Sequence, residues 1–176
     1  MTTGSAQPSQ TPLCVCVVGL GGGGFHWEAQ KIIQAVRRPL ELVLVYGGPN
    51  GGIMYWHSED AIRAKYVVRG PSLTGDGALR KSVLTAGNIV QALRILYREK
   101  PDVVLAVGTA QAVPFAIAAR LANYPLWFAE SVTRVQAPSR TGRLIARLRL
   151  ASKLFYYSPE LAPHYPDGVC IERGAT

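Results

Sequence analysis

Short apolar runs alternate along the chain with longer stretches in which apolar residues recur every three or four positions. The runs are predicted as strands at 13–18, 40–46, 64–68, 103–107, 126–129, 154–157 and 168–171. The longer stretches are predicted as helices at 26–38, 86–99, 110–122 and 141–151. This alternation is typical of parallel crossover units with helices on both faces of a sheet. The pattern therefore predicts an α/β fold, a Rossmann-like doubly wound parallel sheet, as one domain over residues 12–176. Residues 1–11 lack the periodicity and are predicted to be a disordered N-terminal segment.

A glycine-rich loop joins the first predicted strand to the first predicted helix. It contains Gly22, Gly23 and Gly24, followed by Phe25 and His26. Glycines let backbone amides approach a ligand closely, and the start of a helix favours anionic or strongly polar groups. His26 at this position has two interpretations, a general base or sugar-hydroxyl ligand on the one hand and a local bonding role on the other.

A dinucleotide cofactor is disfavoured at this loop. The spacing of its glycines fits G-x-G-x-x-G, but the pattern is weak in a run that is almost entirely glycine. The second predicted strand ends without the Asp or Glu that would hold a ribose. We therefore predict no cofactor, and a dinucleotide-dependent oxidoreductase is the weakest of three functional hypotheses.

The net charge of +8 is concentrated in one part of the chain. Between residues 131 and 159 every ionisable side chain apart from tyrosine is basic, namely Arg134, Arg140, Arg143, Arg147, Arg149 and Lys153. Such a cluster indicates a polyanionic partner, which could be nucleic acid, anionic lipid or a diphosphate group, or else a solvated helix face. Apolar residues alternate with basic ones over 144–155, which favours a basic amphipathic helix on a membrane surface.

Cysteine usage and the apolar runs restrict the remaining possibilities. Cys14, Cys16 and Cys170 form no zinc-like or redox-like set, and the first two share one face of a predicted strand as small apolar filler. No apolar run reaches the roughly 18 residues of a membrane-spanning helix. There is no Asp-x-Asp pair or histidine cluster, so no metal site is predicted.

The second half of the chain carries the most specific motifs. They are the segments Pro101-Asp102 with the aliphatic run to Gly108-Thr109, Glu130-Ser131-Val132-Thr133-Arg134-Val135, and Ser139-Arg140-Thr141-Gly142-Arg143. Their succession resembles the acceptor-binding, membrane-associated subunits of split GT-B UDP-sugar transferases. That group includes the membrane subunit of the eukaryotic dolichol-linked N-acetylglucosaminyltransferase and bacterial exopolysaccharide PssD-like proteins. The N-terminal half of MurG-like enzymes has the same layout.

The resemblance implies one half of an inverting glycosyltransferase, equivalent to the N-terminal half of a GT-B enzyme. A donor-binding partner subunit would bring the UDP-sugar, and this chain would bind a polyprenyl-diphosphate-linked sugar. The heterodimer would act in exopolysaccharide or lipid-linked oligosaccharide synthesis. It would be cytoplasmic and peripheral on the inner face of the cell membrane, and this chain would be inactive alone.

The family motifs also imply roles for individual residues. His26 matches the histidine of a G-x-G-G-H segment, with Phe25 inserted before it, and Glu130 and Arg134 match an E-S-x-x-R-V segment. His26 or Glu130 is the expected base. The lipid diphosphate is expected to contact the loop glycines Gly22, Gly23 and Gly24 together with Arg134, Arg140, Thr141 and Arg143. Arg147, Arg149 and Lys153 are expected to face the membrane surface.

Two alternatives remain at this level. Glu130 and Arg134 could form a local ion pair that orders a loop. The basic segment 134–153 could belong to a module that binds nucleic acid or another anionic ligand, although the chain lacks the aromatic-platform strands and recognition-helix pattern of such modules. The resemblance itself implies no nucleic-acid partner.

Overall fold

Seven parallel strands form a single sheet in the computed structural model, which describes residues 11–21, 24–47, 62–68 and 78–171. The strands are β1 (Leu13–Leu20), β2 (Leu40–Gly47), β3 (Ile62–Val68), β4 (Val103–Val107), β5 (Leu126–Ala129), β6 (Lys153–Tyr156) and β7 (Val169–Cys170). Their order across the sheet is β3-β2-β1-β4-β5-β6-β7, and every neighbouring pair is parallel. The predicted doubly wound α/β fold is confirmed. Of the segment predicted to be disordered, all but Thr11 lies outside the described residues.

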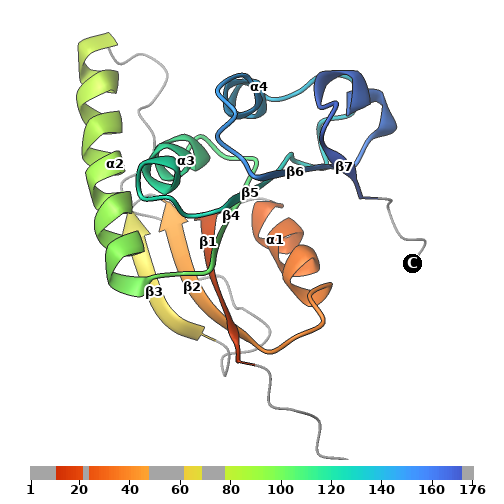
Figure 1. The fold of residues 1–176 in the computed structure, drawn as a ribbon. Coiled ribbons are helices and arrows are strands. Elements are labelled where there is room, and N and C mark those ends of the chain that lie inside the picture. Colours follow the sequence, from red (N-terminus) through yellow and green to blue (C-terminus); the bar gives the residue numbers. More distant parts are fainter. Residues whose placement is uncertain (1–10, 22–23, 48–61, 69–77, 172–176) are drawn as a thin grey trace, which may run out of the picture.

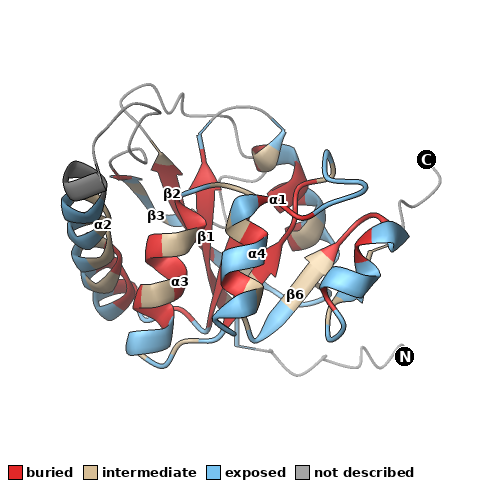
Figure 2. Ribbon diagram, turned by 90° about the horizontal axis from the view of Figure 1, so that it is seen from above, coloured by how far each residue is buried: buried red, intermediate tan, exposed pale blue. Residues whose placement is uncertain are grey.

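The helices cover the two faces of the sheet unequally. They are α1 (Phe25–Gln34), α2 (Ala78–Glu99), α3 (Ala112–Leu121), α4 (Arg140–Arg147) and the short 3-10 helix η2 (Pro159–His164). Helix α1 packs on one face, and α2, α3 and α4 pack on the other (Figure 1). Figure 2 shows that the strands at the centre of the sheet are buried, whereas α2 and α4 expose their outer sides.

Strict alternation along β1 divides the core into two layers. Cys14, Cys16 and Val18 point into the layer shared with α2 and α3, whereas Val15 and Val17 point into the layer shared with α1. Both cysteines are buried and free, as predicted for small apolar filler. Burial raises the pKa of the Cys16 thiol, because a thiolate would be poorly solvated there.

The predicted basic amphipathic helix over 144–155 is wrong. Helix α4 ends at Arg147, the chain turns through Arg149 with a φ of 48°, and β6 begins at Lys153. Trp127 is in register with Lys153, and Ala129 is in register with Phe155. Pairing of β6 with a buried strand therefore outweighs the helical periodicity of the isolated segment.

Other boundaries differ from the sequence prediction by smaller amounts. Helix α2 begins at Ala78 rather than at 86, helix α1 ends at Gln34 rather than at 38, and η2 was not predicted. None of the described helices is long and apolar enough to cross a membrane.

Candidate functional site

The sheet has its topological switch point between β1 and β4. The chain leaves β1 toward β2 and leaves β4 toward β5, so the loops that follow these two strands diverge at their carboxyl ends. In open α/β sheets such a point forms the crevice in which ligands bind. Gly19, the residue before the last of β1, and Gly108, directly after β4, have φ values of 97° and 43°, in the left-handed region that glycine adopts without strain.

The loops at this point are packed closely against each other. A Cβ atom on Gly19 would lie 2.6 Å from Oγ1 of Thr109, and one on Gly108 would lie 2.7 Å from the ring of Phe25. Phe25, which the sequence analysis treated only as an insertion, therefore fills the space above the end of β4. Larger residues at either glycine would push the two loops apart.

His26 lies in the first turn of α1, beside the switch point. Its side chain is buried, with 4% of its surface exposed. Gly24 directly precedes the helix, whereas Gly22 and Gly23 lie outside the described residues. The structure thus brings His26 to the carboxyl edge of the sheet, where the sequence analysis expected it.

Glu130 follows β5 and is the centre of a buried hydrogen-bond cluster, which we call the Glu130 cluster. Its Oε2 accepts hydrogen bonds from the backbone N–H of Ser139 (2.9 Å), the Ser139 hydroxyl (3.1 Å) and the Tyr165 hydroxyl (2.6 Å). Its Oε1 accepts one from the N–H of Ser131 at 3.2 Å. Glu130 has 0% of its surface exposed. Tyr165 is buried as well, and both this burial of its own hydroxyl and the hydrogen bond to Glu130 raise the pKa of Tyr165.

The Glu130 cluster determines where α4 begins. The hydroxyl of Ser139 accepts a hydrogen bond from the N–H of Gly142 at 2.8 Å and so caps the helix. Among the described residues Glu130 forms no ion pair with Arg134, so the local pair considered above is not formed. Enclosure on all sides favours a positioning role for Glu130 over the role of a base.

The residues expected to hold a diphosphate surround the start of α4. Arg134 lies in the loop after β5, and Arg140, Thr141 and Arg143 form the first turn of the helix. The three arginines are exposed. They therefore present guanidinium groups to solvent at the same edge of the sheet as His26, although no contact joins them into one preformed cradle.

The three cations expected to face a membrane lie on different elements but line one hollow. Arg147 ends α4, Arg149 lies in the turn that follows it, and Lys153 begins β6. Together with Arg143 they line a hollow of about 610 Å³ between α4, β6 and η2. The ammonium group of Lys153 also lies 5.4 Å from the ring centre of Trp127. The interpretation as one basic helix face is therefore corrected.

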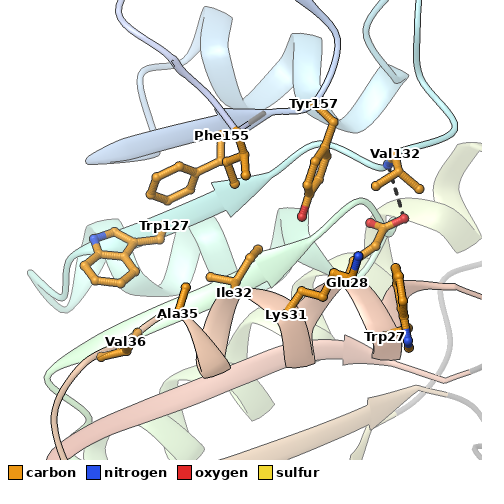
Figure 3. A pocket seen from close by; sticks show the side chains of 11 residues that line it. Trp27, Glu28, Lys31, Ile32, Ala35, Val36, Trp127, Val132, Phe155 and Tyr157 are labelled. Atoms are coloured by element: carbon orange, nitrogen blue, oxygen red, sulfur yellow. Dashed lines mark hydrogen bonds between the residues drawn. The ribbon is translucent and has the colours of Figure 1, made fainter. Parts of the chain in front are cut away.

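Glu28 is a site residue that the sequence analysis missed. It has 2% of its surface exposed, and its Oε1 accepts hydrogen bonds from the Ser131 hydroxyl (3.0 Å) and the N–H of Val132 (3.2 Å) (Figure 3). Burial raises the pKa of its carboxyl group. In the sequence Glu28 is an ordinary acid in the first turn of a helix. Its partners come more than a hundred residues later, and only the fold brings them together.

An apolar groove of about 700 Å³ adjoins Glu28. It lies between α1 and the α1 face of β5 and β6 (Figure 3). Its lining includes Ile32, Trp127 and Phe155, and Tyr157 stands opposite Glu28 at one end. Among the described residues, no group of three or more His, Cys, Asp or Glu side chains is placed to hold a metal ion.

The raised pKa of Glu28 predicts a pH-dependent difference between the wild type and Glu28→Gln. The folded-state pKa of the Glu28 carboxyl group lies above the ordinary value of 4.5. The stability that this shift contributes is therefore fully present below pH 4.5 and is lost as the pH rises through the folded-state pKa. The wild type should therefore gain stability relative to the variant as the pH falls from 7 to 4. Urea unfolding of both proteins at the two pH values measures this difference. A constant difference would contradict the burial of an ionised Glu28.

Two helical glycines should respond in opposite directions to alanine. A Cβ atom on Gly142 would collide with Glu130 Oε2 and the Tyr165 hydroxyl, whereas one on Gly87 of α2 would meet nothing within 4 Å. Gly142→Ala should lower the free energy of unfolding by about 1–3 kcal/mol through overpacking. Gly87→Ala should raise it by about 0.5–1 kcal/mol through helix propensity. Denaturant unfolding compares the two, and a stabilising Gly142→Ala would contradict the close packing of α4 on the Glu130 cluster.

The fold of this domain, a seven-stranded parallel sheet with flanking helices, matches the Rossmann-like N-terminal half of MurG-like GT-B proteins. No protein-family model matches the chain. Over 161 residues the chain is 30% identical to the UDP-N-acetylglucosamine–N-acetylmuramyl-(pentapeptide) pyrophosphoryl-undecaprenol N-acetylglucosamine transferase of Symbiobacterium thermophilum. That match covers 89% of this chain and 42% of the transferase, so the chain spans less than half the length of this relative.

Solved structures agree on the fold. Acinetobacter baumannii MurG superposes with a TM-score of 0.64 at 16% identity, over 85% of this chain and 43% of that chain. The UDP-N-acetylglucosamine 2-epimerase of Rickettsia bellii has a TM-score of 0.58 at 17% identity, over 88% and 41%. The corresponding epimerase of Methanocaldococcus jannaschii has a TM-score of 0.57 at 15% identity, over 92% and 45%. Each similarity covers less than half of the solved chain.

Proposed function

We propose that this chain is the acceptor-binding half of a two-component inverting glycosyltransferase. The enzyme would transfer a sugar from a UDP-sugar to a polyprenyl-diphosphate-linked saccharide in exopolysaccharide or lipid-linked oligosaccharide synthesis. The observation that carries the proposal is the match of 89% of this chain to 42% of a lipid-linked sugar transferase. Since a GT-B reaction takes place between two domains, a donor-binding partner subunit would supply the second one and the UDP-sugar.

His26 is the proposed base for the acceptor hydroxyl. It lies at the start of α1 next to the crevice, where a substrate hydroxyl would be within reach of a side chain from the helix start. Its burial would exclude water from the proton transfer. Glu130 is proposed as a positioning residue that fixes the loop after β5 and the start of α4.

The acceptor diphosphate is proposed to lie between the glycine loop and the start of α4. Gly22, Gly23 and Gly24 would offer backbone amides, and Arg134, Arg140 and Arg143 would offer guanidinium groups, which pair well with phosphate oxygens. Thr141 would donate a hydroxyl hydrogen bond. This arrangement supplies positive charge where the acceptor is most negative.

The proposed location is peripheral, on the cytoplasmic face of the cell membrane. Arg147 and Arg149 are exposed on the α4 side of the domain and would contact anionic headgroups there, each contributing about 1 kcal/mol near the surface. Lys153 lines the same hollow as these two arginines and would contribute there.

Binding to the isolated chain tests the acceptor assignment. Calorimetric titration with a short-chain prenyl-diphosphate-linked N-acetylglucosamine should show saturable binding, whereas UDP-sugars should not bind. Arg134→Ala combined with Arg143→Ala should weaken acceptor binding by about a hundredfold or more, since each charge-assisted hydrogen bond contributes about 1.5–3 kcal/mol. Arg120→Ala is the matched control, an exposed arginine in the last turn of α3.

Two results would overturn this assignment. Binding of UDP-sugars without the acceptor would make the chain a donor-binding half. Salt-sensitive binding of nucleic acid with no affinity for the acceptor would favour the alternative, an anionic-ligand module that uses the hollow lined by Arg143, Arg147 and Arg149.

A further inference from the structure

The α1 face of the sheet carries a binding groove away from the crevice. In the part of the chain that the structure describes, α1 is the one helix on this face (Figure 1). The space beside it is the groove of about 700 Å³, a volume in the range of small-molecule sites. Its walls are mainly aliphatic and aromatic.

Aromatic side chains define the long, apolar part of the groove. The rings of Trp127 and Phe155 contact edge to face, with 6.2 Å between their centres and an angle of 79°. Ile32 of α1 and Val36, just after the end of that helix, line the opposite wall (Figure 3). The walls offer few hydrogen-bonding groups along this length, so they suit a hydrocarbon chain better than a sugar.

One end of the groove is polar. Glu28 Oε1 is used by Ser131 and Val132, but Oε2 is buried without a hydrogen-bond partner among the described residues. A buried carboxylate oxygen without a donor is unfavourable, and a ligand that brings a donor would relieve this cost. The Tyr157 hydroxyl points toward Glu28 across the groove (Figure 3). Burial and the charge of Glu28 raise the pKa of Tyr157 to about 12, so this hydroxyl stays protonated and can donate.

Two lysines contact tryptophan rings of the groove, Lys31 as part of its lining and Lys153 from outside it. The Lys31 ammonium lies 3.7 Å from the ring centre of Trp27, and that of Lys153 lies 5.4 Å from the ring centre of Trp127. Both side chains therefore lie against aromatic rings rather than against the buried carboxylate.

We propose that this groove binds one hydrocarbon chain of an amphiphile whose polar end is a hydroxyl group. The chain lies between α1 and the rings of Trp127 and Phe155, and the hydroxyl donates a hydrogen bond to Glu28 Oε2. A long-chain or isoprenoid alcohol has this chemistry. The site is separate from the switch-point crevice, and the inference holds whether or not the chain takes part in sugar transfer.

The test is a titration of the full chain with farnesol, followed by tryptophan fluorescence because Trp27 and Trp127 line the groove. We expect saturable quenching, and at least tenfold weaker binding of farnesyl methyl ether, which keeps the chain but cannot donate. Glu28→Gln places an amide donor beside the hydroxyl, so the preference for the alcohol over the ether should fall to about one. Thermal unfolding checks that this variant folds.

A blocking variant and its control complete the design. Ala35 lines the groove and is exposed, so Ala35→Phe should abolish quenching by farnesol without disturbing the core. Ala86→Phe, on the exposed side of α2, is the control and should bind farnesol like the wild type. Equal affinity of the wild type for alcohol and ether would overturn the proposal even if Glu28→Gln does not fold. Unchanged binding of farnesol to Ala35→Phe would also overturn it. If the wild type is a dimer that Ala35→Phe converts to a monomer, the groove would belong to a second copy of the chain, and the proposal would be wrong.

Discussion

Glu130→Ala is expected to lower the free energy of unfolding by about 3–5 kcal/mol, a large part of the stability of an ordinary domain. The substitution removes the acceptor of four hydrogen bonds and leaves the Ser139 N–H and the Tyr165 hydroxyl buried without a partner. It also opens a cavity between β5, the start of α4 and η2. Urea unfolding followed by tryptophan fluorescence measures the loss.

Two milder variants separate the contributions to the Glu130 cluster. Tyr165→Phe removes one donor, at 2.6 Å from Glu130, and should cost about 1–2 kcal/mol. Glu130→Gln keeps one acceptor oxygen, so its loss in the free energy of unfolding should lie between the losses of Tyr165→Phe and Glu130→Ala. A loss below 1 kcal/mol for Glu130→Ala would mean that the carboxylate does not organise this part of the fold, and its assignment as a positioning residue would be wrong.

His26→Ala is expected to reduce the rate of sugar transfer by about 10²–10⁴-fold, the usual contribution of a general base. The rate would be measured in the complex with the donor-binding partner, at saturating acceptor. Since His26 is buried, its truncation also creates a small cavity, and the thermal unfolding of the variant has to be compared with that of the wild type.

His164→Ala is the matched control for the histidine. His164 is exposed at the end of η2, so its removal should leave both stability and transfer unchanged. A folded His26→Ala variant that keeps the wild-type rate would remove His26 from the reaction. The base would then have to come from another group.

The centre of the sheet could be predicted from the sequence because its signals are local. The run at 103–107 is aliphatic throughout, and β4 occupies those positions with every residue buried. The alternation of Cys14 and Cys16 with valines likewise matched the two core layers. Such strands are buried on both faces by neighbours on every side, so their own composition is sufficient evidence.

The periphery could not be predicted because long-range contacts decide it. The strand predicted at 154–157 is confirmed as β6, but the basic helix over 144–155 was wrong, because α4 ends at Arg147 and pairing with β5 begins at Lys153. Glu28 gave no signal of its own, since its environment is created by Ser131 and Val132 after β5. Glu130 was predicted as a possible base, but its full burial beneath the hydroxyl of Tyr165 depends on a residue 35 positions later and gave no signal in the sequence.

The structure identifies two regions that suit different chemical groups. The carboxyl edge of the sheet combines glycine loops, His26 and exposed arginines, which suits a charged and polar group. The α1 face combines apolar walls with one buried carboxylate, which suits a hydrocarbon chain with a hydroxyl end. The two proposals are tested independently, the first by transfer and acceptor binding and the second by binding of alcohols.

A transfer assay on membranes tests the half-enzyme assignment most directly. Membranes that contain this chain alone, a donor-binding partner alone, or both would receive a radiolabelled UDP-sugar and a polyprenyl-diphosphate-linked sugar acceptor. Labelled lipid-linked product is expected only when both chains are present. Full activity with this chain alone, or no product although the complex is shown to form, would contradict the assignment.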